Sequence, residues 1–284
     1  MEVLQLYPWV WMVLAGLLGL QFGSFLNLLI WRLPVMLHQQ WEDDVAFSQG
    51  QQTPHRQRFD LFFPGSHCTH CMTPLRASEL VPVLSYLWLK GRCAHCGVAV
   101  SWRYPVVEIA VALWWAWCAG HWGVTPEALA WSGFGTVLLA LALIDADTML
   151  LPDSLTQPLL WAGLILSALG WIHVHLADSV WGAVAGYVSL WLVQQVFKLI
   201  TGKQGMGEGD FKLFAALGAW LGWLALPGTV LIASLLGVLT ALLLRWRGQM
   251  ASDQALPFGP CLAIAGVCIA VFEPALMFSP RFIY

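Results

Sequence analysis

The stretch Gly205-Met206-Gly207-Glu208-Gly209-Asp210 comes directly before an apolar run of the chain, and Asp145-Ala146-Asp147-Thr148-Met149-Leu150-Leu151-Pro152-Asp153 directly follows an earlier one. Apolar runs of roughly 17–25 residues are long enough to cross a bilayer as helices. A carboxylate within a membrane segment is costly and is therefore a functional candidate by default. Two such groups at helix ends suggest a pair that hydrolyses peptide bonds at a membrane surface, provided that both lie on the same side.

The composition is that of a membrane protein, because 59% of the residues are apolar, only 10% are charged, and 18 are Trp. We expect an all-α polytopic fold with about eight transmembrane helices. The sixth and seventh runs are separated only by a predicted turn at Leu226-Pro227-Gly228. The predicted helices are residues 7–31, 105–122, 127–144, 155–172, 178–200, 211–226, 228–244 and 257–279.

The positive charges predict the orientation of these helices. If the connections are numbered along the chain, 12 of the 13 Lys and Arg residues lie on odd-numbered connections, and only Arg281 lies in the tail. Basic residues that flank membrane helices are retained in the cytoplasm. The odd-numbered connections are therefore predicted to be cytoplasmic. Connection three carries Asp145 and connection five carries Asp210, so both acidic motifs are expected on the cytoplasmic face.

The chain is predicted to have three parts. Residues 1–31 form the first transmembrane helix, residues 32–104 a cytoplasmic loop, and residues 105–284 a seven-helix membrane domain. The early part of the loop, from Gln39 to Phe59, is rich in Gln and acidic residues and is expected to be irregular.

Two CxxC pairs lie in this loop, Cys68/Cys71 and Cys93/Cys96, with 21 residues between them. Two such pairs can supply four thiolates to a tetrahedral Zn²⁺ ion, and four cysteines leave no coordination position for a catalytic water. The cytoplasm disfavours disulfides, which strengthens the metal interpretation. The alternatives are four unrelated thiols or a redox pair, although no βαβ pattern surrounds either motif. We expect a structural zinc site, with His67, His70 and His95 as bystanders or as groups that support the ligating cysteines.

The acidic motifs have a plainer interpretation as two solvated interfacial acids, and the residues around them argue against it. Gly205, Gly207 and Gly209 permit backbone turns that are closed to other residues, and they admit a substrate chain close to Asp210. A dinucleotide-binding loop is excluded because no strand precedes these glycines. Two carboxylates that share a site do not both ionise readily, so one retains a proton near neutral pH. The ionised group can then accept a proton from water while the protonated one polarises the scissile carbonyl.

Together these motifs resemble a known family, the bacterial type IV prepilin peptidases, which belong to the GxGD-type membrane aspartic proteases. The resemblance covers nearly the whole chain. It rests on Gly23-Ser24-Phe25-Leu26-Asn27 through Arg32-Leu33-Pro34, the two CxxC pairs, Arg103-Tyr104-Pro105 through Glu108, the motif from Asp145 to Asp153, Gly207-Glu208-Gly209-Asp210-Phe211-Lys212, and Pro257-Phe258-Gly259-Pro260.

The resemblance implies catalytic aspartates at Asp145 and Asp210, although spacing alone leaves Asp147 as an alternative to Asp145. It implies zinc on Cys68, Cys71, Cys93 and Cys96, and S-adenosylmethionine as methyl donor. Gly91 matches a position tied to methyl transfer, and Glu108 is a candidate to position or deprotonate the amine that is methylated. A plain acid at a helix start remains the alternative role for Glu108.

We therefore expect a multi-pass enzyme of the bacterial inner membrane with its active site on the cytoplasmic face. It would cleave the short basic leader from type IV prepilins and type II secretion pseudopilins and then N-methylate the new terminus. The expected partners are this substrate and membrane lipid, with no nucleic acid; the sequence does not specify the oligomeric state. The rival interpretation is a polytopic transporter or channel with a zinc-bound regulatory loop, but a transporter places ionisable residues near mid-membrane rather than at one face.

Overall fold

The computed structural model describes residues 8–52, 58–203, 205–249 and 256–277. Most of these residues are helical, and the described part of the chain contains no β-strand beyond two isolated bridges. The chain divides into two compact units, residues 1–136 and 137–284. Arg281 and the end of the eighth predicted run lie outside the described residues.

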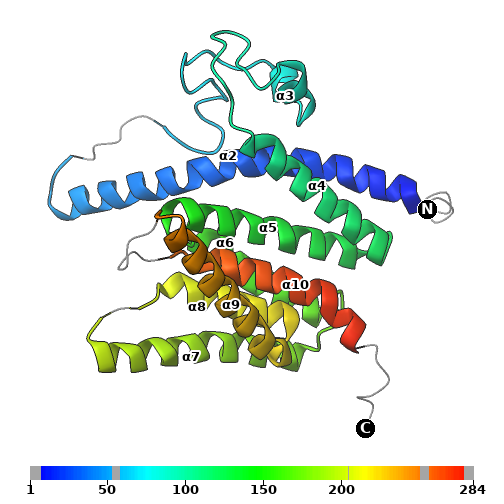
Figure 1. The fold of residues 1–284 in the computed structure, drawn as a ribbon, viewed down its shortest axis with the longest axis vertical. Coiled ribbons are helices and arrows are strands. Elements are labelled where there is room, and N and C mark those ends of the chain that lie inside the picture. Colours follow the sequence, from blue (N-terminus) through cyan, green and yellow to red (C-terminus); the bar gives the residue numbers. More distant parts are fainter. Residues whose placement is uncertain (1–7, 53–57, 204, 250–255, 278–284) are drawn as a thin grey trace. The chain divides into compact units, whose positions relative to one another are not determined.

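Each of the eight predicted apolar runs corresponds to a helix, which confirms the all-α fold class (Figure 1). Between the first two of these helices lie the short 3₁₀ helix η1 (Ala77–Leu80) and α3 (Leu84–Trp88). The long helices are α2 (Pro8–Ser48), α4 (Arg103–Trp122), α5 (Pro126–Thr148), α6 (Asp153–Ala168), α7 (Leu176–Thr201), α8 (Glu208–Leu221), α9 (Leu226–Trp246) and α10 (Gly259–Met277).

Within the described ranges, four segments are long and apolar enough to cross a membrane by themselves, namely residues 9–48, 126–148, 176–201 and 223–246, and α10 contains a shorter apolar helix. At 14 residues, α8 is shorter than a span requires. Eleven of its residues are buried, so its surroundings are protein rather than lipid. A helix enclosed in this way can carry polar groups that a lipid-facing helix cannot.

Two sequence-based expectations about helix ends are wrong. The first helix does not give way to irregular chain at Gln39 but continues to Ser48. Gln and Glu are good helix formers, and His38 contacts Glu42 one turn later with an Nε2–Oε1 distance of 3.2 Å. The polar composition of this segment is therefore that of a helix and not of irregular structure. Residues 53–57 of the segment predicted to be irregular lie outside the described residues.

The break between the sixth and seventh helices lies at Gly222, not at the predicted turn of residues 226–228. Gly222 has a φ of +81°, a backbone conformation that favours glycine and ends α8. A short 3₁₀ segment, η2 (Trp223–Ala225), follows, and Pro227 lies in the first turn of α9. Proline is favoured there because its missing N–H would have no helical partner.

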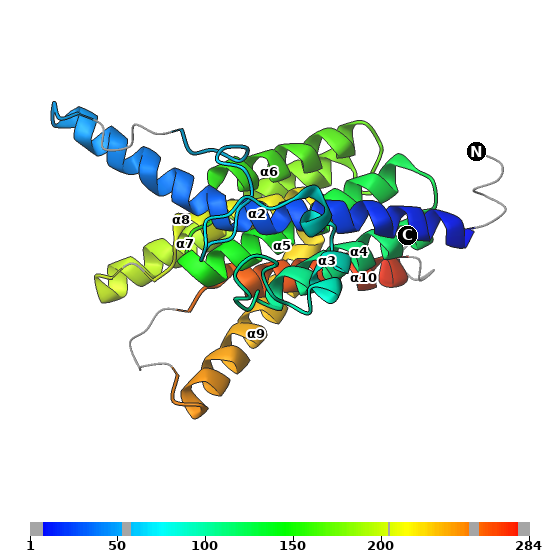
Figure 2. The same cartoon turned by 90° about the horizontal axis from the view of Figure 1, so that it is seen from above.

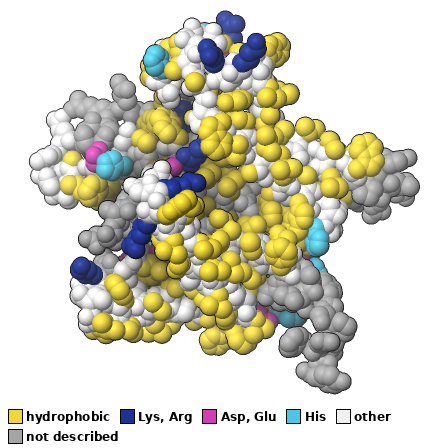
Figure 3. Space-filling view, in the orientation of Figure 1, with side chains coloured by type: hydrophobic (Ala, Val, Ile, Leu, Met, Phe, Trp, Pro, Cys, Tyr) yellow, Lys and Arg dark blue, Asp and Glu magenta, His cyan; other side chains and the backbone are white. Residues whose placement is uncertain are grey.

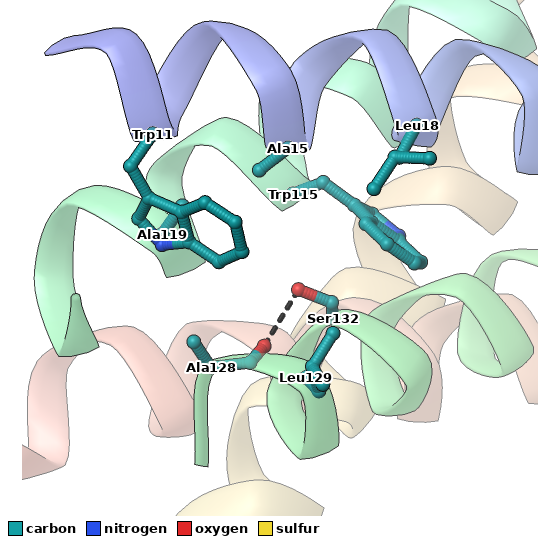
Figure 4. A pocket seen from close by; sticks show the side chains of 8 residues that line it. All are labelled: Trp11, Ala15, Leu18, Trp115, Ala119, Ala128, Leu129 and Ser132. Atoms are coloured by element: carbon teal, nitrogen blue, oxygen red, sulfur yellow. Dashed lines mark hydrogen bonds between the residues drawn. The ribbon is translucent and has the colours of Figure 1, made fainter. Parts of the chain in front are cut away.

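In the first unit, α2 and α4 pack closely through glycines. A Cβ added to Gly19 would lie 2.8 Å from the Cα of Ala112, and one added to Gly23 would lie 2.6 Å from the Cα of Glu108. Glycines four residues apart allow membrane helices to approach in this way. Figure 4 shows the neighbouring packing of α2, α4 and the start of α5, where the Ser132 hydroxyl donates a hydrogen bond to the Ala128 carbonyl (2.6 Å).

In the second unit, α8 is the central helix and packs against α6, α7 and α10 (Figures 1 and 2). Its contact with α7 is backbone to backbone, because a Cβ on Gly182 would lie 2.1 Å from the Gly218 carbonyl oxygen. Gly186 approaches Phe214 in the same way. The tight packing of these two helices fixes the position of the residue that begins α8, and with it the acidic motif.

Candidate active site and metal centre

Asp145 lies in the last turn of α5, and its side chain is buried. Its Oδ2 accepts a hydrogen bond from the backbone N–H of Gly259 (2.9 Å), the first residue of α10. A Cβ on Gly259 would lie 2.7 Å from this same oxygen, so only glycine allows the approach. The N-terminus of α10 thus places a backbone donor and the positive end of a helix dipole against the carboxylate.

Asp210 lies in the first turn of α8, two residues after the helix begins, and is also buried. Its Oδ1 has no hydrogen-bond partner among the residues that the structure describes. A buried carboxylate oxygen is normally satisfied, so this oxygen is available to water or to a bound substrate.

The two aspartates lie close enough to interact electrostatically, and Cys261, in the first turn of α10, interacts with both. The three side chains come from α5, α8 and α10, which are far apart in sequence. The structure therefore brings together the two predicted catalytic residues within the second unit. Two neighbouring carboxylates that are shielded from water form the arrangement in which one proton is shared.

The glycines of the GxGD motif have a different role from the predicted one. None of Gly205, Gly207 and Gly209 has a positive φ, so the expectation of turns closed to other residues is wrong. Gly205 and Gly209 allow close contact instead. A Cβ on Gly205 would lie 2.7 Å from the Phe197 ring, and one on Gly209 would lie 2.6 Å from the Cβ of Leu151. The second contact joins the start of α8 to the segment that follows Asp145.

Gln194, on α7, holds the segment that leads to Asp210. Its Oε1 accepts hydrogen bonds from the backbone N–H groups of Gly205 and Met206, both at 3.1 Å. The side chain is buried, as expected for an amide with two partners. Phe197, one turn later on the same helix, covers Gly205. No sequence signal distinguishes Gln194 from the other glutamines of the chain.

The remaining acids of the first motif lie differently. Asp147 is exposed, whereas Asp145 is buried. Asp153, the first residue of α6, accepts two hydrogen bonds from Lys212 Nζ (2.7 and 2.8 Å), which ties α6 to α8 beside the site. The side chain of Asp153 is 61% exposed, so we assign this pair a small energetic role.

The four predicted metal ligands form one cluster in the first unit. The sulfur atoms of Cys68, Cys71, Cys93 and Cys96 all lie within 4.8 Å of one another, and no disulfide joins them. Tetrahedral zinc with Zn–S distances of about 2.3 Å requires sulfur separations of about 3.8 Å. The Cys68 and Cys96 sulfurs are 3.9 Å apart, so the cluster fits such an ion.

Each CxxC pair lies on a similar tight turn. The N–H of Cys68 donates to the Thr73 carbonyl (3.0 Å), and the N–H of Cys93 donates to the Val98 carbonyl (2.9 Å). Hydrogen bonds from Thr73 lower the pKa of Cys71 to about 6, which favours the thiolate that binds metal. The described histidines of the loop do not join the cluster.

A cavity of about 630 Å³ lies within the first unit, between α2, α4 and the loop. Gly91 and Glu108 both line it. Glu108 is buried and accepts a hydrogen bond from the N–H of Val83 through Oε2 (2.7 Å). Gly91 has a φ of +67°, and a Cβ there would lie 2.9 Å from the Tyr86 ring. The two candidate residues for methyl transfer therefore share one cavity of a size typical for small-molecule sites.

Comparison with known proteins identifies two matching family profiles and several relatives. The profile of the Bacterial Peptidase A24 N-terminal domain matches residues 17–122, and that of the Type IV leader peptidase family matches residues 132–242. A protein of Pseudomonas putida is 50% identical over 264 residues, which cover 93% of this chain and 91% of the relative. A Stutzerimonas stutzeri relative is 46% identical over 267 residues, covering 93% of this chain and 92% of its own.

A Dickeya chrysanthemi relative is 47% identical over 265 residues, or 92% of each chain. All three are named prepilin leader peptidase/N-methyltransferase. No solved structure matches the chain significantly. The two family profiles, together with 50% identity over 93% of the chain, show that this chain belongs to the type IV leader peptidase family.

Proposed function

We propose that the protein is an aspartic endopeptidase of the bacterial inner membrane that removes the basic leader of type IV prepilins or type II secretion pseudopilins and then N-methylates the new terminus. The observation that carries the proposal is the pair of buried aspartates in the second unit, in a chain of this family. Incubation of the purified protein with a pilin precursor tests it. We expect a product shortened by the leader, whereas an uncut precursor would favour the transporter interpretation.

In the proposed mechanism the two aspartates have different roles. Asp145 is assigned as the ionised group because its Oδ2 accepts the Gly259 N–H at the start of α10. Asp210 also lies in the first turn of a helix and has a backbone hydrogen bond at Gly207, but its Oδ1 has no partner among the described residues, and we assign the proton to it. Asp145 accepts a proton from the attacking water, and protonated Asp210 polarises the scissile carbonyl. Because the pair shares a proton, it titrates as a unit.

The positive charges of the chain support a location of the active site on the cytoplasmic face. Basic residues lie on connections one, five and seven; connection five carries Asp210, and connection three, which carries Asp145, shares their side of the membrane because the helices alternate in direction. The substrate's basic leader is retained on the same side. The apolar stem of the pilin then lies in the bilayer, with the scissile bond at the level of the helix ends.

We propose that zinc binds the four cysteines and stabilises the loop, since a small polar segment has little apolar core of its own. For methylation, the cavity that holds Gly91 and Glu108 is the proposed site of S-adenosylmethionine. The cofactor supplies an electrophilic methyl group. Glu108, from α4, is placed to orient the amine that accepts the methyl group, and the Tyr86 ring lies against Gly91.

Alanine substitutions at two glycines test whether this cavity is the site of methyl transfer. We expect Gly91→Ala to lower methyl transfer at least tenfold and spare cleavage, because the new Cβ would displace the Tyr86 ring. Gly97→Ala is the matched control, since Gly97 has a similar φ of +72° but nothing within 4 Å of its added Cβ. Both changes carry backbone strain of about 1–2 kcal/mol. Equal methylation by the two variants, measured with labelled methyl donor and a pre-cleaved pilin, would contradict the assignment of the cavity.

Substitutions at two neighbouring glutamines test whether Gln194 positions the segment that leads to Asp210. Gln194→Leu removes the acceptor of two buried N–H groups, at a cost of about 1–3 kcal/mol each. We expect the kcat for cleavage to fall roughly tenfold or more, with partial recovery in Gln194→Glu, which retains an acceptor. Gln195→Leu, the neighbouring glutamine, is the control and should cleave normally. Normal cleavage by Gln194→Leu would show that this side chain does not position Asp210.

A further inference from the structure

The short helix α3 lies beside the membrane helices of the first unit rather than beyond their ends. Ser85 and Tyr86 of α3 line the same cavity as Ser24 and Phe25 of α2. Ser24 precedes Arg32 by eight residues, or about 12 Å along a helix. Both views of the fold show α3 beside the middle of α2, far from its end at Ser48 (Figures 1 and 2).

The contact between the start of α3 and α4 also places α3 beside the membrane segment of that helix and not beyond its end. The N–H of Val83, the residue before α3, donates to Glu108 Oε2 (2.7 Å). Glu108 follows Arg103, the first residue of α4, by five positions, or about 8 Å along that helix. Arg32 and Arg103 bound the predicted membrane runs of α2 and α4. The level of α3 therefore lies within the apolar segments of both helices.

The two faces of α3 differ. Ser85 and Tyr86 line the cavity, whereas Leu84, Leu87 and Trp88 are 63%, 65% and 86% exposed. A soluble domain rarely exposes three large apolar side chains together. The exposed apolar surface of α4, which includes Val106 (47%) and Ile109 (42%), lies at the same depth. The outer face of α3 thus continues an apolar surface whose surroundings are lipid.

Two basic residues come shortly after α3 in the sequence. Lys90 and Arg92 are exposed, and Figure 3 shows Lys and Arg side chains beside apolar ones over the loop that carries α3. Trp together with Lys and Arg is typical of the boundary between acyl chains and headgroups. Basic residues at this level attract anionic lipids.

We propose that α3 docks into the cytoplasmic interface of the bilayer, with Leu84, Leu87 and Trp88 among the acyl chains and Lys90 and Arg92 at anionic headgroups. The inference rests on the membrane placement of α2 and α4 that the proposed function assumes. Docking of this kind holds the cavity of the first unit at the membrane surface.

Depth-dependent quenching tests this docking. A fluorescent amino acid is placed at Trp88 of the full-length protein in nanodiscs of phosphatidylcholine and phosphatidylglycerol, with a doxyl quencher near the top of the acyl chain. The matched control is the same label at Phe47, which is 80% exposed and lies 15 residues beyond Arg32 on α2, about 22 Å further along the helix.

We expect quenching at position 88 to exceed that at position 47 at least threefold, and Leu87→Ser to reduce it. Equal quenching at the two positions, or cross-linking of position 88 to a second copy of the chain instead of to lipid, would overturn the docking. The readout does not depend on activity. A protein that shows quenching but leaves pilin precursor uncut would contradict the proposed function and leave the docking intact.

Discussion

Asp145→Asn and Asp210→Asn are each expected to abolish cleavage of a pilin precursor. The mechanism requires one ionised carboxylate beside one protonated one, and an amide can neither accept the proton of the attacking water nor donate one to the carbonyl oxygen. Loss of acid or base catalysis at a positioned group costs about 10²–10⁴-fold in rate. Cleavage is measured by the loss of the leader from purified precursor, with membrane insertion and metal content of each variant measured in parallel.

Asp147→Asn is the matched control, because Asp147 lies two residues from Asp145 but is exposed. It should cleave at nearly the wild-type rate. Near-normal processing by Asp145→Asn combined with loss of activity in Asp147→Asn would exchange the roles of the two residues. Near-normal processing by Asp210→Asn would remove the GxGD aspartate from the mechanism.

Cys71→Ser and Cys93→Ser are each expected to reduce bound zinc from one ion per chain to well below that, and to loosen the loop. Three thiolates and a hydroxyl form a poor site for an ion that prefers four thiolates here, and metal binding is coupled to folding in a segment with little core. Zinc is measured by elemental analysis of purified protein and loosening by limited proteolysis. Cys268→Ser, in α10 and outside the cluster, should retain the zinc.

Absence of zinc from carefully purified wild-type protein would contradict the structural-zinc proposal. Disulfide mapping of the four cysteines would then be the next experiment, because sulfurs that lie within 4.8 Å of one another are near enough to pair as disulfides if no metal is bound. The compartment favours thiols.

Much of the fold was predictable because lipid imposes a simple requirement on sequence. Every bilayer-spanning segment must satisfy its own backbone, so apolar runs are read as helices with little ambiguity. Their ends were less predictable. The extension of α2 to Ser48 and the break at Gly222 depend on local helix propensity and on a single positive φ, which the apolar pattern does not contain.

The site was predictable in part. Asp145, Asp210 and the four cysteines could be predicted as candidates because acidic residues beside apolar runs and paired CxxC motifs are rare by chance. Their partners were not, because a backbone donor such as the Gly259 N–H or a helix-borne amide such as Gln194 acts through tertiary contacts between segments distant in sequence. The glycines of the motif were recognised, but their role in close packing became clear only from what a Cβ would contact.

The sharpest test of the account uses Asp210→Asn with two substrates, an intact precursor and a pilin from which the leader has already been removed, each with labelled S-adenosylmethionine. Before the cut, the nitrogen belongs to a peptide bond and its lone pair is delocalised, so it is a poor nucleophile. After the cut it is an α-amine with a pKa of about 7.7–8.0 in model compounds, and part of it is neutral at cytoplasmic pH. The account predicts that the variant methylates the pre-cleaved pilin and leaves the intact precursor unmethylated. Failure of the folded variant to methylate the pre-cleaved pilin would show that the two activities share one site and would contradict the account.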